Sequence, residues 1–546
     1  MFGLYVIVAM CLAICPVVSV TVVAAVILNR AAFNGRYWGY MLFSLAGMAF
    51  LYFGYRTGDP VIPFMICREH VGMAFPFLGL HADHVDLRAW MLSDLRTVGL
   101  SMTVAMLSLY LATRTPERMM MDEERRREQA KLRVQPIEYV PERSQLIVGV
   151  SGAGKSAYIG KTIEEILRRD PGAFIVVVDG KGSTEKYSLH YSCRIIAEKT
   201  EKELLILNGT NNEGLDGVVY DFLDEVEGSD SMKDMVMALE DDPTVKASAG
   251  SRHYRVMTER YILELMELML ESGVDITLYN SMKIADPFDL ENALGYMDMD
   301  EGKKAAVLAF AQEHWHEVKA NIEKIRMFLR GQGGRIFMGS GKRTNIRKAY
   351  KEGAIVLVLA DEMSMPSLAS KLVQLVTMDI RNLVAGRLTG KIDMDRKVYV
   401  IYDEFSSYTS SVPLVKSLFA RARSADTIMT LATQSCSDII ALGDGWFDTI
   451  LDTADRFVVF RQNSGEASEA AATIFGTEIH VTGTARSSEM QATGEASNTV
   501  DRSFIVSPDM IRNLRVNHGF LLDKTRKEGH QLRYFKNRFV RRGDGL

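Results

Sequence analysis

Residues 145–169 read QLIVGVSGAGKSAYIGKTIEEILRR, which is an apolar run, a glycine-rich loop and a helix-like stretch. This order predicts a strand, a loop and a helix. Gly149, Gly152 and Gly154 let the backbone curl so that successive N–H groups point at one anion, and the following helix adds the positive end of its dipole. The stretch therefore predicts a site for the phosphates of a nucleoside triphosphate.

The loop also carries the side chains that a nucleotide and its metal ion need. We expect Lys155 to reach the β- and γ-phosphates of ATP and Ser156 to ligate Mg²⁺. The alternative is a glycine-rich turn before a helix that binds nothing. Chance alone produces the bare pattern in roughly a few per cent of chains this long. The predicted nucleotide-binding residues are Gly149, Ser151, Gly152, Ala153, Gly154, Lys155, Ser156 and Ala157.

A second stretch, 397–404 (KVYVIYDE), ends an apolar run in two carboxylates. Such a run is typical of a buried parallel strand. We expect it to deliver Asp403 to the Mg²⁺ ion and Glu404 to the attacking water as general base. Many core strands end in an acid by chance, so the catalytic interpretation depends on the pairing with the glycine-rich loop.

Length, composition and charge limit the possible classes of protein. The chain has 546 residues, of which 47% are hydrophobic, and we expect about two or three domains with large cores. The net charge of −5 excludes a polycation, so any contact with nucleic acid must come from a local surface. The five cysteines show no CxxC spacing, and Cys193 and Cys436 are expected to be buried thiols in a reducing cytoplasm.

The amino-terminal part has the pattern of a membrane domain. Residues 3–29 are apolar without one charge, and 37–55 are apolar with tyrosines and a tryptophan near the ends. A third, shorter candidate is 97–112, whose alternative is a buried hairpin or an amphipathic helix. A cleaved signal peptide is disfavoured, because the first residues lack a basic segment. We therefore predict about three transmembrane helices within residues 1–113.

Basic residues predict the orientation of these spans. Arg30 and Arg36 lie between the first two spans, and a second basic group fills a juxtamembrane linker, 114–139. Both groups belong on the cytoplasmic side. This places residues 56–96 outside and the nucleotide site in the cytoplasm. The second group consists of Arg114, Arg118, Arg125, Arg126, Arg127, Lys131 and Arg133.

The remaining chain predicts an α/β core with a helical insertion. Short apolar runs alternate with helical stretches, which is the pattern of a parallel sheet covered on both faces. Ligands bind such sheets at the carboxyl ends of the strands. Between 223 and 345 the apolar spacing becomes helical, so we expect a nucleotide-binding domain in two pieces, 140–222 and 346–546, around an all-α domain. The predicted strands are 145–150, 174–178, 354–360, 397–402, 426–432 and 456–460, and the predicted helices of the core are 157–169, 366–388 and 412–423.

Two polar segments near the end of the chain have no apolar periodicity. The first, 482–502, is rich in Ser, Thr, Gly, Glu and Ala and is predicted to be a flexible loop. The second, 536–542, is basic. It is either a solvated tail or a contact for nucleic acid, lipid headgroups or a partner protein.

From about residue 140 onward the motifs resemble, in order and spacing, those of the conjugative type IV secretion coupling proteins, membrane ATPases related to FtsK and HerA. After the loop, 174–182 (FIVVVDGKG) looks like the second strand of that family and its Asp-x-Lys-Gly turn. The acidic strand ends Asp-Glu-Phe, and 422–435 (ARSADTIMTLATQS) is similar to the sensor strand. Two departures are the third membrane span and Gly180, where proline or another residue is more usual.

The resemblance implies a RecA-like P-loop core, a homohexamer and a location in the bacterial inner membrane. It implies that Gln434 faces the γ-phosphate, and that a neighbouring subunit supplies an arginine, for which Arg423 and Arg421 are candidates. The implied function is delivery of single-stranded DNA, with its relaxase, to channel proteins of a secretion system.

The sequence leaves other functions open. They are an ATPase for protein export, a membrane receptor switched by nucleotide, and a chromosome-segregation pump. Glu404 argues against the receptor, because a switch has less need of a water-activating base.

Overall fold

The computed structural model describes residues 131–540, except 213, 241–248, 332, 409–410, 444, 489–490 and 528–530. The described residues all belong to one compact unit. The three predicted spans and most of the basic linker lie outside the described residues. Among the helices that the structure describes, none is both long and apolar enough to cross a membrane.

The core of this unit is a nine-stranded sheet with the strand order β13-β12-β9-β1-β8-β7-β2-β6-β3. The seven strands from β9 to β3 are parallel, and β12 and β13 add an antiparallel edge. The predicted parallel sheet is therefore confirmed for most of its strands. The bounds are β1 Gln145–Val148, β2 Phe174–Asp179, β3 Leu204–Gly209, β6 Ile355–Ala360, β7 Val398–Asp403, β8 Thr427–Thr433, β9 Arg456–Val459, β12 His518–Asp523 and β13 Leu532–Lys536.

Apolar side chains cover both faces of the sheet, which explains the uninterrupted apolar runs. Every residue of β2, β6 and β7 is buried. Along β2, Ile175 and Val177 join one hydrophobic layer with α7 and α8, whereas Val176 and Val178 join the layer that contains α16. Alternate residues of a strand point to opposite faces, so a strand covered on both sides must be apolar throughout.

The helices of the core match the predicted stretches closely. The prediction 366–388 is confirmed by α16, Pro366–Leu388, and 157–169 corresponds to α7, Lys155–Arg169. The other helices of the core are α8 Leu189–Thr200, α15 Ile346–Glu352, α17 Val412–Arg421, α18 Cys436–Ala441, α19 Trp446–Thr453, α20 Gly465–Phe475 and α21 Pro508–Arg512, with short 3₁₀ turns η3 Phe405–Ser407 and η4 Ala422–Ala425.

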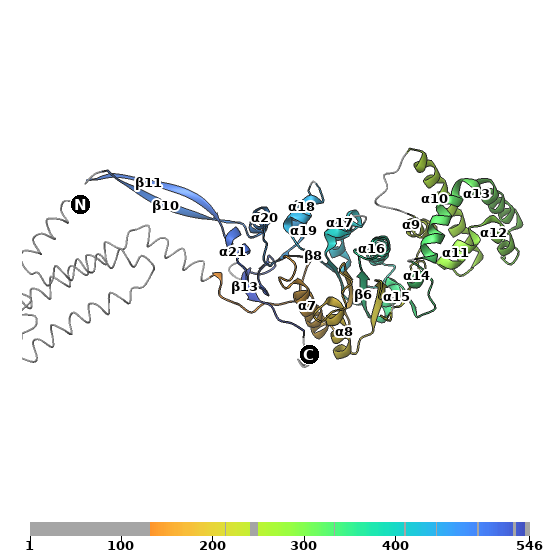
Figure 1. Cartoon of the computed structure of the whole chain (residues 1–546), viewed down its shortest axis with the longest axis horizontal. Helices are drawn as coiled ribbons and strands as arrows, with labels where there is room; N and C mark the ends of the chain where they lie inside the picture. Colours follow the sequence, from red (N-terminus) through yellow and green to blue (C-terminus); the bar gives the residue numbers. More distant parts are fainter. Residues whose placement is uncertain are drawn as a thin grey trace, which may run out of the picture. The chain divides into compact units, whose positions relative to one another are not determined.

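A group of helices interrupts the core between two short parallel strands, β4 (Val219–Tyr220) and β5 (Arg343–Thr344). Its two longest helices, α10 and α13, pack against each other, and Figure 1 shows the group in green. The predicted domain limits, with 223–345 as the insertion, stay a prediction. The helices are α9 Ser229–Met237, α10 Ala249–Ser272, α11 Leu278–Ile284, α12 Pro287–Leu294, α13 Glu301–Arg330 and α14 Gly334–Met338.

The prediction of a flexible loop at 482–502 is wrong. Its described residues lie in an antiparallel pair, β10 (Thr477–Ser488) and β11 (Gln491–Phe504). Antiparallel pairing satisfies the backbone groups of a polar segment directly. Apolar alternation reveals a strand only where one face is buried, so a ribbon of polar residues gives no such signal.

Candidate functional site

The glycine-rich loop, 149–156, connects the end of β1 to the start of α7. Gly154, just before the helix, has φ +121°, a conformation that side chains with a Cβ rarely adopt. A Cβ there would also lie 2.7 Å from Oδ1 of Asn517. The loop therefore requires glycine at this position for two independent reasons.

Backbone hydrogen bonds hold the first half of the loop against the sheet. The N–H of Gly149 donates to the carbonyl of Thr433 over 3.2 Å, and that of Val150 donates to the carbonyl of Arg461 over 3.0 Å. Thr433 ends β8, and Arg461 follows β9. The loop is thus fixed at the carboxyl edge of the sheet, where ligands of parallel sheets bind.

Two asparagines hold the second half of the loop. The N–H of Asn517 donates to the carbonyl of Ala153 over 2.9 Å, and Nδ2 of Asn537 donates to the carbonyl of Gly154 over 3.0 Å. The N–H of Asn537 also donates to the carbonyl of Asn517 over 2.7 Å. These residues flank the antiparallel edge strands, which the sequence analysis did not foresee.

Lys155 and Glu404 meet beneath the loop. Nζ of Lys155 donates to the carbonyl of Gly149 over 2.5 Å and lies 3.5 Å from Oε1 of Glu404. A second lysine, Lys181, lies closer to the same oxygen, with 2.9 Å between Nζ and Oε1. Burial lowers the pKa of Lys155, and the charges of Glu404 and Asp403 oppose that shift. Burial also acts to lower the pKa of Lys181, but the neighbouring carboxylates outweigh it and raise this pKa.

Asp403 and Asp179 are register partners at the ends of β7 and β2. Both are buried, and neither carboxylate oxygen of Asp403 accepts a hydrogen bond from the residues that the structure describes. Burial raises the pKa of Asp403, and burial together with the charge of Asp403 raises the pKa of Asp179 to about 7. A buried carboxylate is costly unless it is paired or binds a cation. The oxygens of Asp403 therefore fit a Mg²⁺ ion, with Ser156, half-buried in the first turn of α7, as its predicted second ligand.

The turn after β2 carries Lys181 and approaches the acidic strand. Oδ1 of Asp179 accepts a hydrogen bond from the N–H of Lys181 over 3.0 Å. The hydroxyl of Tyr408 donates to the carbonyl of Asp403 over 3.2 Å, and a Cβ on Gly180 would lie 2.5 Å from that hydroxyl. The departure at Gly180 therefore makes room for Tyr408. Sequence reasoning assigned no role to Lys181 or Tyr408, although the Asp-x-Lys-Gly turn was visible.

Gln434 and Arg423 lie at opposite edges of the sheet. Gln434 directly follows β8 and is exposed at the edge of the loop, where its carbonyl accepts a hydrogen bond from Nε2 of Gln462 over 3.2 Å. Arg423 and Arg421, also exposed, precede β8. A strand of this length separates the two edges by about 20 Å. Within one chain, the structure thus brings Gln434 to the loop and leaves Arg423 away from it.

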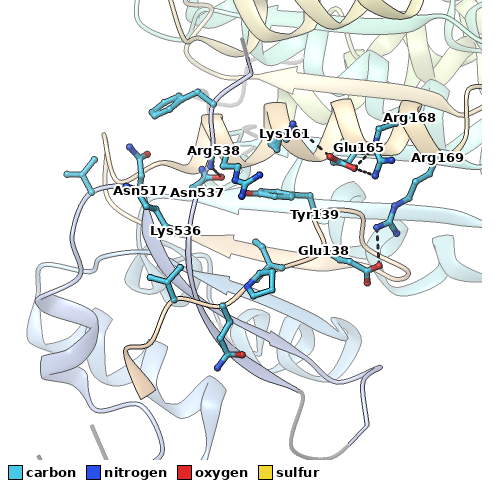
Figure 2. Close-up of a pocket in the computed structure, with 16 residues that line it drawn as sticks. Glu138, Tyr139, Lys161, Glu165, Arg168, Arg169, Asn517, Lys536, Asn537 and Arg538 are labelled. Carbon is cyan, nitrogen blue, oxygen red and sulfur yellow. Dashed lines mark hydrogen bonds and ion pairs between the residues drawn. The ribbon is translucent and has the colours of Figure 1, made fainter. Parts of the chain in front are cut away.

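A cavity of about 1030 Å³ lies along the outer side of α7. Figure 2 shows it between the helix, the segment before β1 and the residues that follow β13. It borders the glycine-rich loop through Asn517 and Asn537, which line it. Its charges are partly paired, since Glu165 accepts from Arg168 over 2.5 Å. The lining also includes Glu138, Tyr139, Lys161, Arg169, Lys536 and Arg538.

Comparisons with known proteins agree with the motifs. The model of a family described as the type IV secretion-system coupling protein DNA-binding domain matches residues 132–528. No curated protein matches the chain. Three of the solved structures that resemble the chain are the following, and each has a low sequence identity to it. The unbound bacterial conjugative coupling protein TrwB is 15% identical, with 73% of this chain and 86% of that chain covered and a TM-score of 0.45. TrwB with the ATP analogue ADPNP is 12% identical over the same shares, 73% and 86%, with a TM-score of 0.48. VirB4 of Thermoanaerobacter pseudethanolicus is 11% identical, over 73% and 89%, with a TM-score of 0.45.

Proposed function

Since the chain belongs to the family of type IV secretion-system coupling proteins, we propose that it is an inner-membrane ATPase that couples ATP hydrolysis to the delivery of DNA, with its relaxase, to a secretion channel. The meeting of Lys155, Asp403 and Glu404 beneath the glycine-rich loop is the observation that carries this proposal. Lys155 supplies a positive charge there, Asp403 is a candidate metal ligand, and Glu404 is a candidate general base.

Each residue of the site has a proposed role. Lys155 and the N–H groups of the loop bind the phosphates, while Ser156 and Asp403 hold Mg²⁺. The ion supplies neutralisation of the charge on the transferred phosphoryl group. Glu404 accepts the proton of the attacking water, and Gln434 faces the γ-phosphate from the end of β8. The base and sugar of the nucleotide extend into the cavity beside α7, which borders the loop (Figure 2).

The remaining parts of the proposal concern assembly and location. Arg423 is exposed and distant from the loop of its own chain, which supports a role at the site of a neighbour in a ring. The charge-free stretch 3–29 supports a membrane anchor, with the ATPase in the cytoplasm. The family description supports DNA as the cargo.

The decisive experiment measures ATP hydrolysis by the full-length chain in detergent, with and without single-stranded DNA. We expect DNA to raise the rate, and the stimulation to fade as salt rises from about 50 to 200 mM, because the contacts are mainly to phosphates. Glu404→Gln is the matched control and should bind ATP without turning it over. A hexameric, active chain that ignores DNA at every salt concentration would refute the DNA proposal and favour protein export. A chain that binds ATP but hydrolyses none would favour the nucleotide-switched receptor.

A further inference from the structure

Glu404 is held by two lysines that differ in their other contacts. Nζ of Lys155 is 3.5 Å from Oε1 of Glu404 but 2.5 Å from the carbonyl of Gly149, so its principal contact is the loop. Nζ of Lys181 is 2.9 Å from Oε1. Among the described cations, these two are the ion-pair partners of Glu404. Lys181 makes the closer contact with the carboxylate.

The local backbone fixes the partners of this second ion pair. Glu404 has φ +56°, a left-handed conformation that a side chain of its kind rarely adopts. Lys181 sits in a turn closed by the hydrogen bond from its own N–H to Oδ1 of Asp179. The two turns are joined through Tyr408, which donates to the carbonyl of Asp403 and fills the space that Gly180 leaves open. Both ends of the ion pair thus lie in turns that the side chain of Tyr408 connects.

Binding of a nucleotide changes the balance between the lysines. In the proposed function, Lys155 binds the phosphates of the nucleotide. The phosphates then compete with Glu404 for the ammonium group of Lys155. Lys181 belongs to a different segment, the turn after β2, and keeps its contact with Glu404. One oxygen of the carboxylate stays bound to an ammonium group, and the other stays free for the proton of the water.

From these contacts we infer that Lys181 is a positioning residue for Glu404, holding the general base in the orientation that hydrolysis needs. The inference deepens the proposed function and rests on it. Misplacement of a reacting group by about 1 Å costs on the order of 100-fold in rate. Loss of the ion pair should therefore lower kcat far more than it changes nucleotide affinity.

The test compares variants of the full-length chain in detergent. We expect Lys181→Met to lower kcat about 10- to 100-fold, with the Kd for a fluorescent ATP analogue within about threefold of the parent. Lys181→Arg keeps the charge and should recover part of the rate. Lys186→Met removes another exposed lysine of the same segment, one over the ring of Tyr187, and should leave kcat unchanged.

A double-mutant cycle separates positioning from a direct contact with phosphate. Because Lys181 acts through Glu404, single-turnover rates of Glu404→Gln and of the double variant Lys181→Met/Glu404→Gln should agree within about twofold. Additive losses would overturn the inference, as would a Kd that weakens by the same factor as kcat. If Lys181→Met does not fold, Lys181→Gln takes its place in the cycle.

The outcomes also separate this inference from the proposed function. An active parent whose Lys181→Met variant keeps full activity overturns the inference alone. A parent without ATP hydrolysis overturns the proposed function, and the inference with it.

Discussion

Buried charge is handled differently at the two edges of the central sheet. At the carboxyl edge, the carboxylate of Asp403 is buried, and neither of its oxygens accepts a hydrogen bond from the described residues. At the amino edge, the equally buried Arg387 donates from Nε to the carbonyl of Ala425 and from Nη1 to the hydroxyl of Tyr350 and the carbonyl of Arg396. Only Nη2 of its guanidinium lacks a partner among the described residues.

The difference suggests that buried charge stabilises the fold at one edge of the sheet and binds a ligand at the other. A buried charge with hydrogen-bond partners stabilises the fold. Arg387, for example, links the segments that precede β7 and β8 through the carbonyls of Arg396 and Ala425. Charge that is left unsatisfied costs stability and is expected where a ligand completes the contacts. The comparison therefore predicts that substitutions at the carboxyl edge change activity, whereas substitutions of buried charge at the amino edge change stability.

The largest effect is expected from Lys155→Ala and Glu404→Gln at the carboxyl edge. Each should lower the rate of ATP hydrolysis by about 10²- to 10⁴-fold, because each removes a group that, in the proposed function, acts on the phosphate or the water. Their melting temperatures, measured without nucleotide, should equal or exceed that of the parent. Glu352→Gln, at an exposed carboxylate that ends α15 before β6, is the control and should keep its activity. Turnover within twofold of the parent in either variant would remove the site assignment.

A smaller effect is expected at the amino edge, from Arg387→Met. The substitution leaves buried oxygens without a donor and should lower the free energy of unfolding by about 2 to 4 kcal/mol. Molecules that remain folded should hydrolyse ATP at the parent rate. Arg423→Met, at an exposed arginine near the same edge, is the control and should change stability by less than about 0.5 kcal/mol. Equal melting temperatures for the parent and Arg387→Met would break the comparison.

The smallest effect concerns Asp379, a buried carboxylate in α16 that does have partners. Its Oδ2 accepts from the hydroxyl of Tyr220 and from the N–H of Ile346, each over 3.0 Å. Burial nevertheless raises its pKa from 3.8 to about 6. The folded state therefore binds the proton more tightly, and the stability gained from this group below pH 4 is lost as the pH rises through about 6.

Asp379→Asn removes this dependence on pH. Between about pH 4.5 and pH 7 the parent should lose on the order of 1 to 2 kcal/mol relative to the variant. Thermal unfolding of both chains across that range measures the difference. A gap that stays constant with pH would show that the carboxyl of Asp379 does not titrate differently in the folded state.

The sequence predicts those elements whose structure follows from a pattern of neighbouring residues. Six strands and three core helices were recognised because a sheet covered on both faces requires apolar runs, and because the glycine-rich loop has a fixed spacing. Asp403 and Glu404 were found because they end such a run. The parallel strand β3, the antiparallel edge strands and the polar ribbon were missed. The apolar runs of β3 and β12 are short, and the ribbon has no apolar periodicity that differs from irregular chain.

The missed residues of the site depend on contacts between distant parts of the chain. Asn517 and Asn537 reach the loop from the far end of the sequence, and Lys181 meets Glu404 only because β2 and β7 pair. No spacing within the sequence encodes such a pairing. Lys181 could be seen in the Asp-x-Lys-Gly turn, but its contact with Glu404 depends on the pairing of β2 with β7.

The asparagine contacts of the loop also set an order in time. Gly154 and its partner Asn537 are 383 residues apart. A ribosome that adds about 5 to 20 residues per second makes the loop roughly 20 to 80 seconds before it makes Asn537. During synthesis the loop therefore exists before the groups that hold its carbonyls, and its full set of hydrogen bonds forms only after Asn537 has been made.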